Sequence, residues 1–399
     1  MNQAFIKLEE PARKGGAAPA WALWQLGFRP FYLLASAFAA LSVPLWALQF
    51  SGWLPQPYLA GAVWHAHEML FGYALAVVVG FLFTAVRNWS GRPTPTGPAL
   101  AALALLWLAG RVLVLTPFGW PAALVNCAFP LAAAVGIAVP LVRARNRRNY
   151  FFIGLLVLLG LAQLGVHLVQ LGVLAAPDWL GIRLGLDLLL FIMAVMGGRV
   201  IPMFTNNGVP GAAARRKPML ELIALGGLLA LVLADAFGLR GAPLAALLAL
   251  CAAAHLLRLL LWQPWLTLRT PLVWVLHAAY LWIVVHLVLR AAAELGWIAP
   301  TLAAHALTVG AVGALTLGMM TRTARGHTAR PLRADSFDVA CYLLVLVAAL
   351  VRVLLPLAVP SAAQPAVLIS ALFWSAAFAL YARSYWPVLT RARLDGKPG

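Results

Sequence analysis

Residues 62–86 read AVWHAHEMLFGYALAVVVGFLFTAV, a mostly apolar stretch whose first turns carry His65, His67 and Glu68. An α-helix needs about 20 apolar residues to cross a hydrocarbon core of about 30 Å, so this stretch is long enough to span a membrane. Ionisable side chains at membrane depth are costly and usually face a protein interior or a cavity. Three of them so close together predict a binding site for a metal ion or a metal-bearing cofactor.

Comparable apolar runs recur along nearly the whole chain of 399 residues, of which 63% are hydrophobic and 10% are charged. A soluble domain carries about 25% charged residues. The sequence therefore predicts an all-α, polytopic transmembrane bundle of twelve helices, and residues 1–399 are expected to form a single integral membrane domain. The predicted spans are 30–50, 62–86, 97–116, 120–142, 150–173, 180–198, 218–238, 242–262, 271–293, 300–320, 336–357 and 365–388.

The basic residues predict the orientation of these spans. The chain carries 29 lysines and arginines against 11 acidic residues, a net charge of +18. All but five of the basic residues fall on one side of the twelve-span topology, and short cytoplasmic loops carry such an excess in membrane proteins. Both termini are therefore predicted to be cytoplasmic. The same distribution points to the lipid bilayer, and not to nucleic acid, as the partner of these charges.

The cysteines limit how a cofactor is held. Cys127, Cys251 and Cys341 lie far apart inside apolar segments, and the sequence contains no CxxC motif. A disulfide framework and a thiolate zinc site are therefore not expected. The CxxCH motif for covalent haem attachment is also absent, so a haem would be bound non-covalently.

The predicted topology gives each histidine a depth. Five of the eight histidines fall in one outer layer, on four helices, and they are His65, His67, His167, His286 and His305. Imidazole suits copper, iron and zinc, and side chains that converge from facing helices build cofactor sites in bundles. An isolated histidine in a membrane helix also commonly makes an interhelical hydrogen bond, which is our interpretation of His255.

The spacing within the first cluster restricts its geometry. His65 and His67 point about 200° apart on an α-helix, so they do not share one metal while both are helical. They serve two neighbouring centres, or the start of the helix is irregular. Glu68 lies on the face of His65, where it is expected to ligate, to orient an imidazole or to carry protons.

A set of short motifs runs from about residue 25 to residue 333. They are Gly27-Phe28-Arg29-Pro30-Phe31; Trp64-His65-Ala66-His67-Glu68-Met69-Leu70-Phe71-Gly72; Gly197-Gly198-Arg199-Val200-Ile201-Pro202; Pro271-Leu272-Val273-Trp274-Val275-Leu276-His277; His305-Ala306-Leu307-Thr308-Val309-Gly310; and Gly318-Met319-Met320-Thr321-Arg322. In this combination the chain resembles the NnrS family of integral membrane proteins, which contain haem and copper and are linked to nitric oxide metabolism.

The resemblance implies a multi-pass protein of the bacterial inner membrane with a b-type haem and copper. Its role would lie in the response to nitric oxide and nitrosative stress, with nitric oxide as ligand or substrate. The positions that match the family pattern are His65, His67, His167, His277 and His305. His277 lies deeper than the other four, so there are two centres at different depths or its span is shifted.

We expect His67 and His305 to be axial ligands of the haem. His65 and His167 would contribute to copper or a second centre, with Glu68 in a supporting role behind the ligands. The expected partners of the haem propionates are the outer-side arginines, because a guanidinium matches the carboxylate fork; they are Arg111, Arg183, Arg290 and Arg352. Arg199 on the inner side would serve instead if the haem lies nearer the cytoplasm.

Three functions stay open at this stage. The chain acts as a haem–copper oxidoreductase that turns over nitric oxide, or it binds and senses nitric oxide without turnover. The third is a transporter of copper, haem or a small anion, because Pro202 after Gly197-Gly198 and polar residues near the midplane also suit a carrier.

Overall fold

The structure is a computed structural model that describes residues 21–50, 52–54, 58–59, 61–177 and 179–397. Within these residues every regular element is a helix, and no strand occurs. Eleven helices are long and apolar enough to cross a membrane, and the shorter apolar helix Gly97–Leu113 is a further candidate. The chain is thus an integral, multi-pass membrane protein built from helices, which confirms the predicted fold class.

The described residues form two compact units. The N-terminal unit comprises residues 21–186, 323–331 and 381–397, and the C-terminal unit comprises residues 187–322 and 332–380. Three helices, α7, α12 and α14, run from one unit into the other. The expectation of a single domain over residues 1–399 stays a prediction, and residues 1–20 lie outside the described part.

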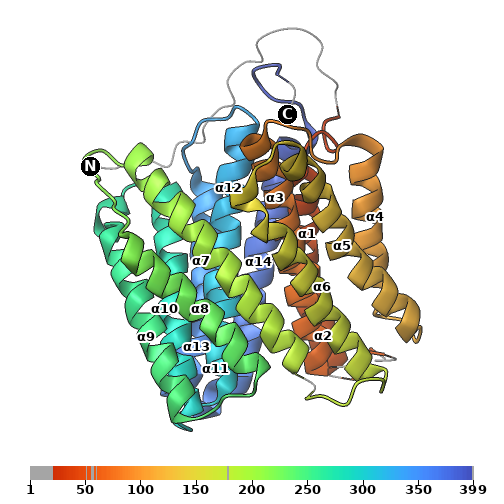
Figure 1. The fold of residues 1–399 in the computed structure, drawn as a ribbon, viewed down its shortest axis with the longest axis vertical. Helices are drawn as coiled ribbons and strands as arrows, with labels where there is room; N and C mark the ends of the chain where they lie inside the picture. Colours follow the sequence, from red (N-terminus) through yellow and green to blue (C-terminus); the bar gives the residue numbers. More distant parts are fainter. Residues whose placement is uncertain (1–20, 51, 55–57, 60, 178, 398–399) are drawn as a thin grey trace. The chain divides into compact units, whose positions relative to one another are not determined.

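The N-terminal unit is built around α1, η1, α3 and α5, with α4 and α6 packed on α5 (Figure 1). The bounds of its helices are α1 Phe28–Phe50, α2 Gly61–His67, η1 Glu68–Ala74, α3 Leu75–Ser90, α4 Gly97–Leu113, α5 Gly119–Arg143, η2 Arg147–Asn149 and α6 Phe151–Gln170.

The C-terminal unit is centred on α10, which packs against α9, α11 and η4, while α8 covers α9 and α13 covers η4. The bounds of the remaining helices are α7 Leu180–Gly208, α8 Pro218–Ala236, α9 Ala242–Leu261, η3 Pro264–Thr267, α10 Pro271–Glu294, α11 Pro300–His305, η4 Ala306–Gly313, α12 Ala314–His327, α13 Ser336–Ala358, η5 Pro360–Ala362 and α14 Ala363–Thr390.

The stretches that follow the predicted spans 180–198 and 300–320 are partly helical, so the predicted ends of these two spans were wrong. Helix α7 continues to Gly208 and α12 continues to His327. In the α7 extension the Thr205 hydroxyl donates to the Ile201 carbonyl at 2.8 Å, and Thr328, directly after α12, donates to the Ala324 carbonyl at 2.6 Å. The apolar pattern shows where a chain leaves lipid, but a helix can continue beyond that point, as α7 and α12 do.

Candidate metal and cofactor site

The helix that carries the first histidine cluster changes its winding at that cluster. Helix α2 ends at His67, and η1, from Glu68 to Ala74, is a π-helix before α3 resumes the α-helical form. The Leu75 N–H donates to the carbonyl of Leu70, five residues earlier. π-helical segments are rare and occur frequently at functional sites. The second π-helix, η4, also begins directly after a histidine, His305.

Glu68 lies at the centre of a buried ion pair in the N-terminal unit. Its Oε1 accepts hydrogen bonds from Arg111 of α4 and from the adjacent His67 Nδ1, each at 2.8 Å. All three side chains are buried, with Arg111 6% exposed and the other two fully enclosed. A buried carboxylate and guanidinium offset each other's desolvation only when they are paired and hydrogen-bonded, and this pair meets that condition.

Asn126 of α5 joins this ion pair to the next helices. Its Oδ1 accepts from Arg111, and its amide donates to the carbonyls of Ala122 at 2.8 Å and Gly110 at 3.3 Å. The Gln163 amide of α6 donates to the same Oδ1 at 3.3 Å. Four helical segments, η1, α4, α5 and α6, are therefore linked by one polar network.

The two imidazoles of the network lie side by side. The ring centroids of His67 and His167 are 4.8 Å apart in an edge-to-face arrangement. Because the His67 Nδ1–H donates to Glu68, its Nε2 carries a lone pair, which accepts from the Gln163 amide at 3.2 Å. The His167 Nδ1 lies 2.9 Å from the hydroxyl of Tyr58, which precedes α2.

Tyr58 acts as a neutral phenol at this site. Burial raises the pKa of its hydroxyl to about 12, so the group is protonated over the physiological range. It is stacked parallel to the His167 ring, with an angle of 7° between the planes. The contact with the phenol at Nδ1 fixes the orientation of the imidazole, whose Nε2 is buried.

Several buried polar atoms of the network have no hydrogen-bond partner among the described residues. They are Glu68 Oε2, Arg111 Nε, Gln163 Oε1 and His167 Nε2. Such an atom costs about 1–3 kcal/mol when it is buried and unsatisfied, so several of them in one network are unusual. We call this set of residues, Tyr58, His67, Glu68, Arg111, Asn126, Gln163 and His167, the His67–His167 cluster.

His65 faces a different neighbourhood from His67. Its ring lies 4.6 Å from the ring of Trp46 in α1, whereas His67 faces α6. The two residues belong to the α-helical part of the span and so point in different directions, as their spacing predicts.

His277 and His305 lie in the C-terminal unit and differ in their surroundings. Both ring nitrogens of His277 face oxygens, since Nδ1 lies 3.1 Å from the Val273 carbonyl and Nε2 lies 3.3 Å from the Thr205 hydroxyl. A histidine with an oxygen at each ring nitrogen is typical of a residue that stabilises the fold and has no nitrogen left for a metal. The His305 Nδ1 donates to the Thr301 carbonyl at 2.6 Å, which leaves its Nε2 in the form that binds a metal.

Two of the arginines expected to face haem propionates, Arg183 and Arg199, lie on α7. Arg183 is partly buried in the N-terminal unit, two residues beyond Gly181, whose backbone packs closely on Ala162 of α6. Arg199 is partly exposed and lies within the helix, not in the loop that the sequence predicts.

His255 and His286 also lie in the C-terminal unit, and each contacts an oxygen. His255 bonds to the Tyr280 hydroxyl at 2.6 Å, as expected for an interhelical contact, and the His286 Nδ1 lies 2.8 Å from the Ala303 carbonyl.

The sequence did not predict a role for Asn126 or Tyr58, since neither residue stands in a polar stripe. Within the described part of the chain, no three His, Cys, Asp or Glu side chains are arranged to hold a metal ion.

Residues 22–393 match the sequence profile of the family described as NnrS protein. The chain belongs to the NnrS family. The match covers nearly all of its 399 residues, which confirms the resemblance found in the motifs. NnrS membership fits a membrane protein related to nitric oxide. A comparison with curated proteins finds no match.

Proposed function

We propose that this chain is a haem- and copper-binding protein of the bacterial inner membrane that acts in the response to nitric oxide. The His67–His167 cluster is proposed as the place where a metal is held. The observation that carries the proposal is the pair of adjacent, fully buried imidazoles, one of which has an unpartnered Nε2.

The donor chemistry of the cluster fits copper or haem iron. Neutral imidazole nitrogen suits both metals. A metal-binding histidine usually donates its other ring N–H to a carboxylate, a carbonyl or water, and His67 does so to Glu68. His167 offers its Nε2 in the tautomer whose Nδ1–H donates to the Tyr58 oxygen, while the Tyr58 hydroxyl donates to the His167 carbonyl at 3.5 Å. His67 offers its own Nε2 once the Gln163 amide turns away. His305, with its Nδ1–H on a backbone carbonyl, stays the proposed ligand from the C-terminal unit.

The protein's own residues prepare this site. Glu68 fixes the ring of His67 and makes its Nε2 more basic, while Arg111 balances the carboxylate charge. Tyr58 orients His167, and the apolar helices around the cluster exclude water. Haem iron and copper, when bound, supply nitric oxide binding and electron exchange.

The test is an optical spectrum of the purified protein from haem-replete cells. It is recorded oxidised, reduced with dithionite, and reduced with nitric oxide added, alongside copper analysis. The proposal expects a haem band that shifts when nitric oxide is added. The absence of any haem band contradicts it and favours a transporter, which metal-dependent uptake into vesicles would then reveal.

A further inference from the structure

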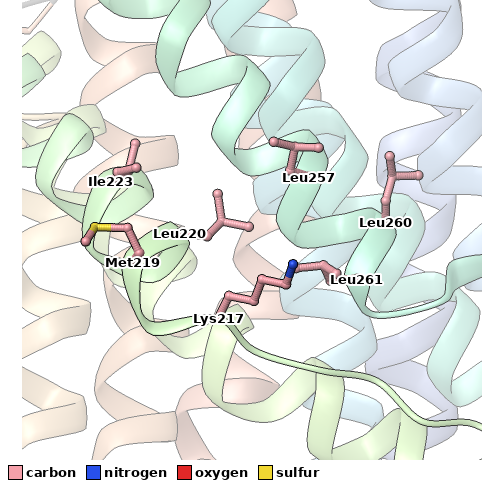
Figure 2. A pocket seen from close by; sticks show the side chains of 7 residues that line it. All are labelled: Lys217, Met219, Leu220, Ile223, Leu257, Leu260 and Leu261. Carbon is pink, nitrogen blue, oxygen red and sulfur yellow. The ribbon is translucent and has the colours of Figure 1, made fainter.

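An apolar groove lies between α8 and α9 of the C-terminal unit (Figure 2). Its volume is about 450 Å³, within the range of about 300–1,000 Å³ that ligand sites have. Figure 2 shows apolar side chains from both helices around this space, with the Lys217 side chain extending toward Leu261. The lining residues are Lys217, Met219, Leu220, Ile223, Leu257, Leu260 and Leu261.

The groove is apolar along its length and positive at one end. Lys217 is the one charged residue of its lining, and no carboxylate pairs with it among the described residues. Glu221, one turn further along α8, is already bound by Arg258 at 2.9 Å and by Arg216 at 3.1 Å. Arg215 and Arg216 directly precede Lys217 and are exposed, so a net positive charge remains at this end.

The basic segment is fixed in place by hydrogen bonds. The Arg215 N–H donates to the carbonyl of Leu261 at the end of α9, at 3.0 Å. The Ala213 N–H donates to Gln263 Oε1 at 2.7 Å, and Asn206 exchanges two hydrogen bonds with the backbone of Ala214. These bonds hold the backbone of the basic segment beside the end of α9, so the loop itself does not have to become ordered when an anion binds.

The same end of the groove carries a marker of the membrane surface. Trp265 follows α9 and is 55% exposed, and exposed tryptophans concentrate at the level of the lipid headgroups. Lys217 stands at the start of α8, where the polar loop meets the apolar helix. A ligand in this groove would have its anionic group among the headgroups and its apolar part in the hydrocarbon region.

We propose that the α8–α9 groove binds an anionic phospholipid, with the phosphate at Lys217 and an acyl chain along Leu220, Ile223 and Leu257. Basic pockets between membrane helices bind anionic headgroups in this way. The orientation predicted from the sequence puts the site in the cytoplasmic leaflet. This inference does not depend on haem or copper, so it is independent of the proposed function.

Native mass spectrometry of the detergent-purified full chain tests the proposal, with phosphatidylglycerol or phosphatidylcholine added at equal concentration. The wild type is expected to retain phosphatidylglycerol preferentially. Lys217→Ala should weaken phosphatidylglycerol binding about fivefold, the effect of one basic side chain near an anionic surface, and leave phosphatidylcholine binding unchanged. Leu257→Trp, which fills the groove, should weaken the binding of both lipids.

The matched control is Arg148→Ala, which removes an exposed arginine from η2 in the N-terminal unit. Thermal unfolding of each variant verifies that it is folded. The proposal is overturned if Lys217→Ala binds like the wild type, or if Arg148→Ala loses as much binding. It is also overturned if inorganic phosphate alone displaces the lipid fully, or if Leu257→Trp converts a dimer to a monomer without any change in bound lipid.

Discussion

Glu68 carries the charge balance of the buried cluster, because both Arg111 and His67 donate to its Oε1. Glu68→Leu would leave the guanidinium of Arg111 buried without a counter-charge. Removing one partner of a buried ion pair costs about 3–5 kcal/mol, and we expect a loss of that size in the free energy of unfolding in detergent. The double variant Glu68→Leu/Arg111→Met should recover part of the loss.

A surface pair provides the control for this prediction. Arg393 and Asp395 form an ion pair at 2.8 Å near the C-terminal end, outside the helices. Exposed pairs contribute little to stability, so Asp395→Ala should leave the unfolding transition unchanged. If Asp395→Ala and Glu68→Leu lower the free energy of unfolding equally, burial does not make the Glu68–Arg111 pair more important for stability than a surface pair.

Tyr280 belongs to a buried polar network that we interpret as structural and not as a ligand site. Its hydroxyl accepts from Arg258 at 2.5 Å and contacts the His255 Nδ1 at 2.6 Å in the fully buried core of the C-terminal unit. Tyr280→Phe removes the partner of both groups and should cost about 1–3 kcal/mol in thermal or chemical unfolding. Iron and copper content should not change. A loss of bound metal in a folded Tyr280→Phe protein would show that this network also supports a metal site.

The π-helix η1 is the element that brings Glu68 against α4. Trp107 Nε1 donates to the Gly72 carbonyl in η1 at 2.9 Å, and a Cβ at position 72 would collide with the Arg111 guanidinium. Gly72→Ala should therefore displace Arg111 from Glu68, lower stability and alter the absorption of a bound haem.

Gly165→Ala is the matched control for Gly72→Ala. It adds the same methyl group to α6, two residues before His167, where nothing lies within 4 Å of the new Cβ. An alanine there fits a helix at least as well as glycine, so stability and spectrum should be retained. If the two variants behave alike, the close approach of Arg111 to η1 is not important.

The apolar runs predicted the position of nearly every helix, because the length of a span is set by the thickness of the membrane. They could not predict η1 or η4, since hydrophobic periodicity does not distinguish π-helical from α-helical winding within an apolar run. Of the candidate site, His67, Glu68 and His167 came from the sequence. The contacts of Tyr58 and Asn126 depend on tertiary packing and did not.

At the scale of the whole molecule, the twelve-span topology predicts which loops face which side. Trp297, 74% exposed between α10 and α11, belongs to the predicted outer side, and Arg148 to the inner side. The native cysteines are buried, so an introduced cysteine can be labelled selectively. Trp297→Cys should react with a membrane-impermeant maleimide in spheroplasts, and Arg148→Cys only after permeabilisation. The reverse pattern would invert the predicted orientation.

The most direct test of the account is the metal content of purified His67→Ala and His167→Ala proteins. Iron and copper per chain are measured together with the optical spectrum, with His255→Asn as the buried histidine control from the structural network. The account predicts that at least one metal falls below half of the wild-type amount in both alanine variants and is retained in the control. Full iron and copper with an unchanged spectrum in both alanine variants would contradict the assignment of the His67–His167 cluster as the metal site.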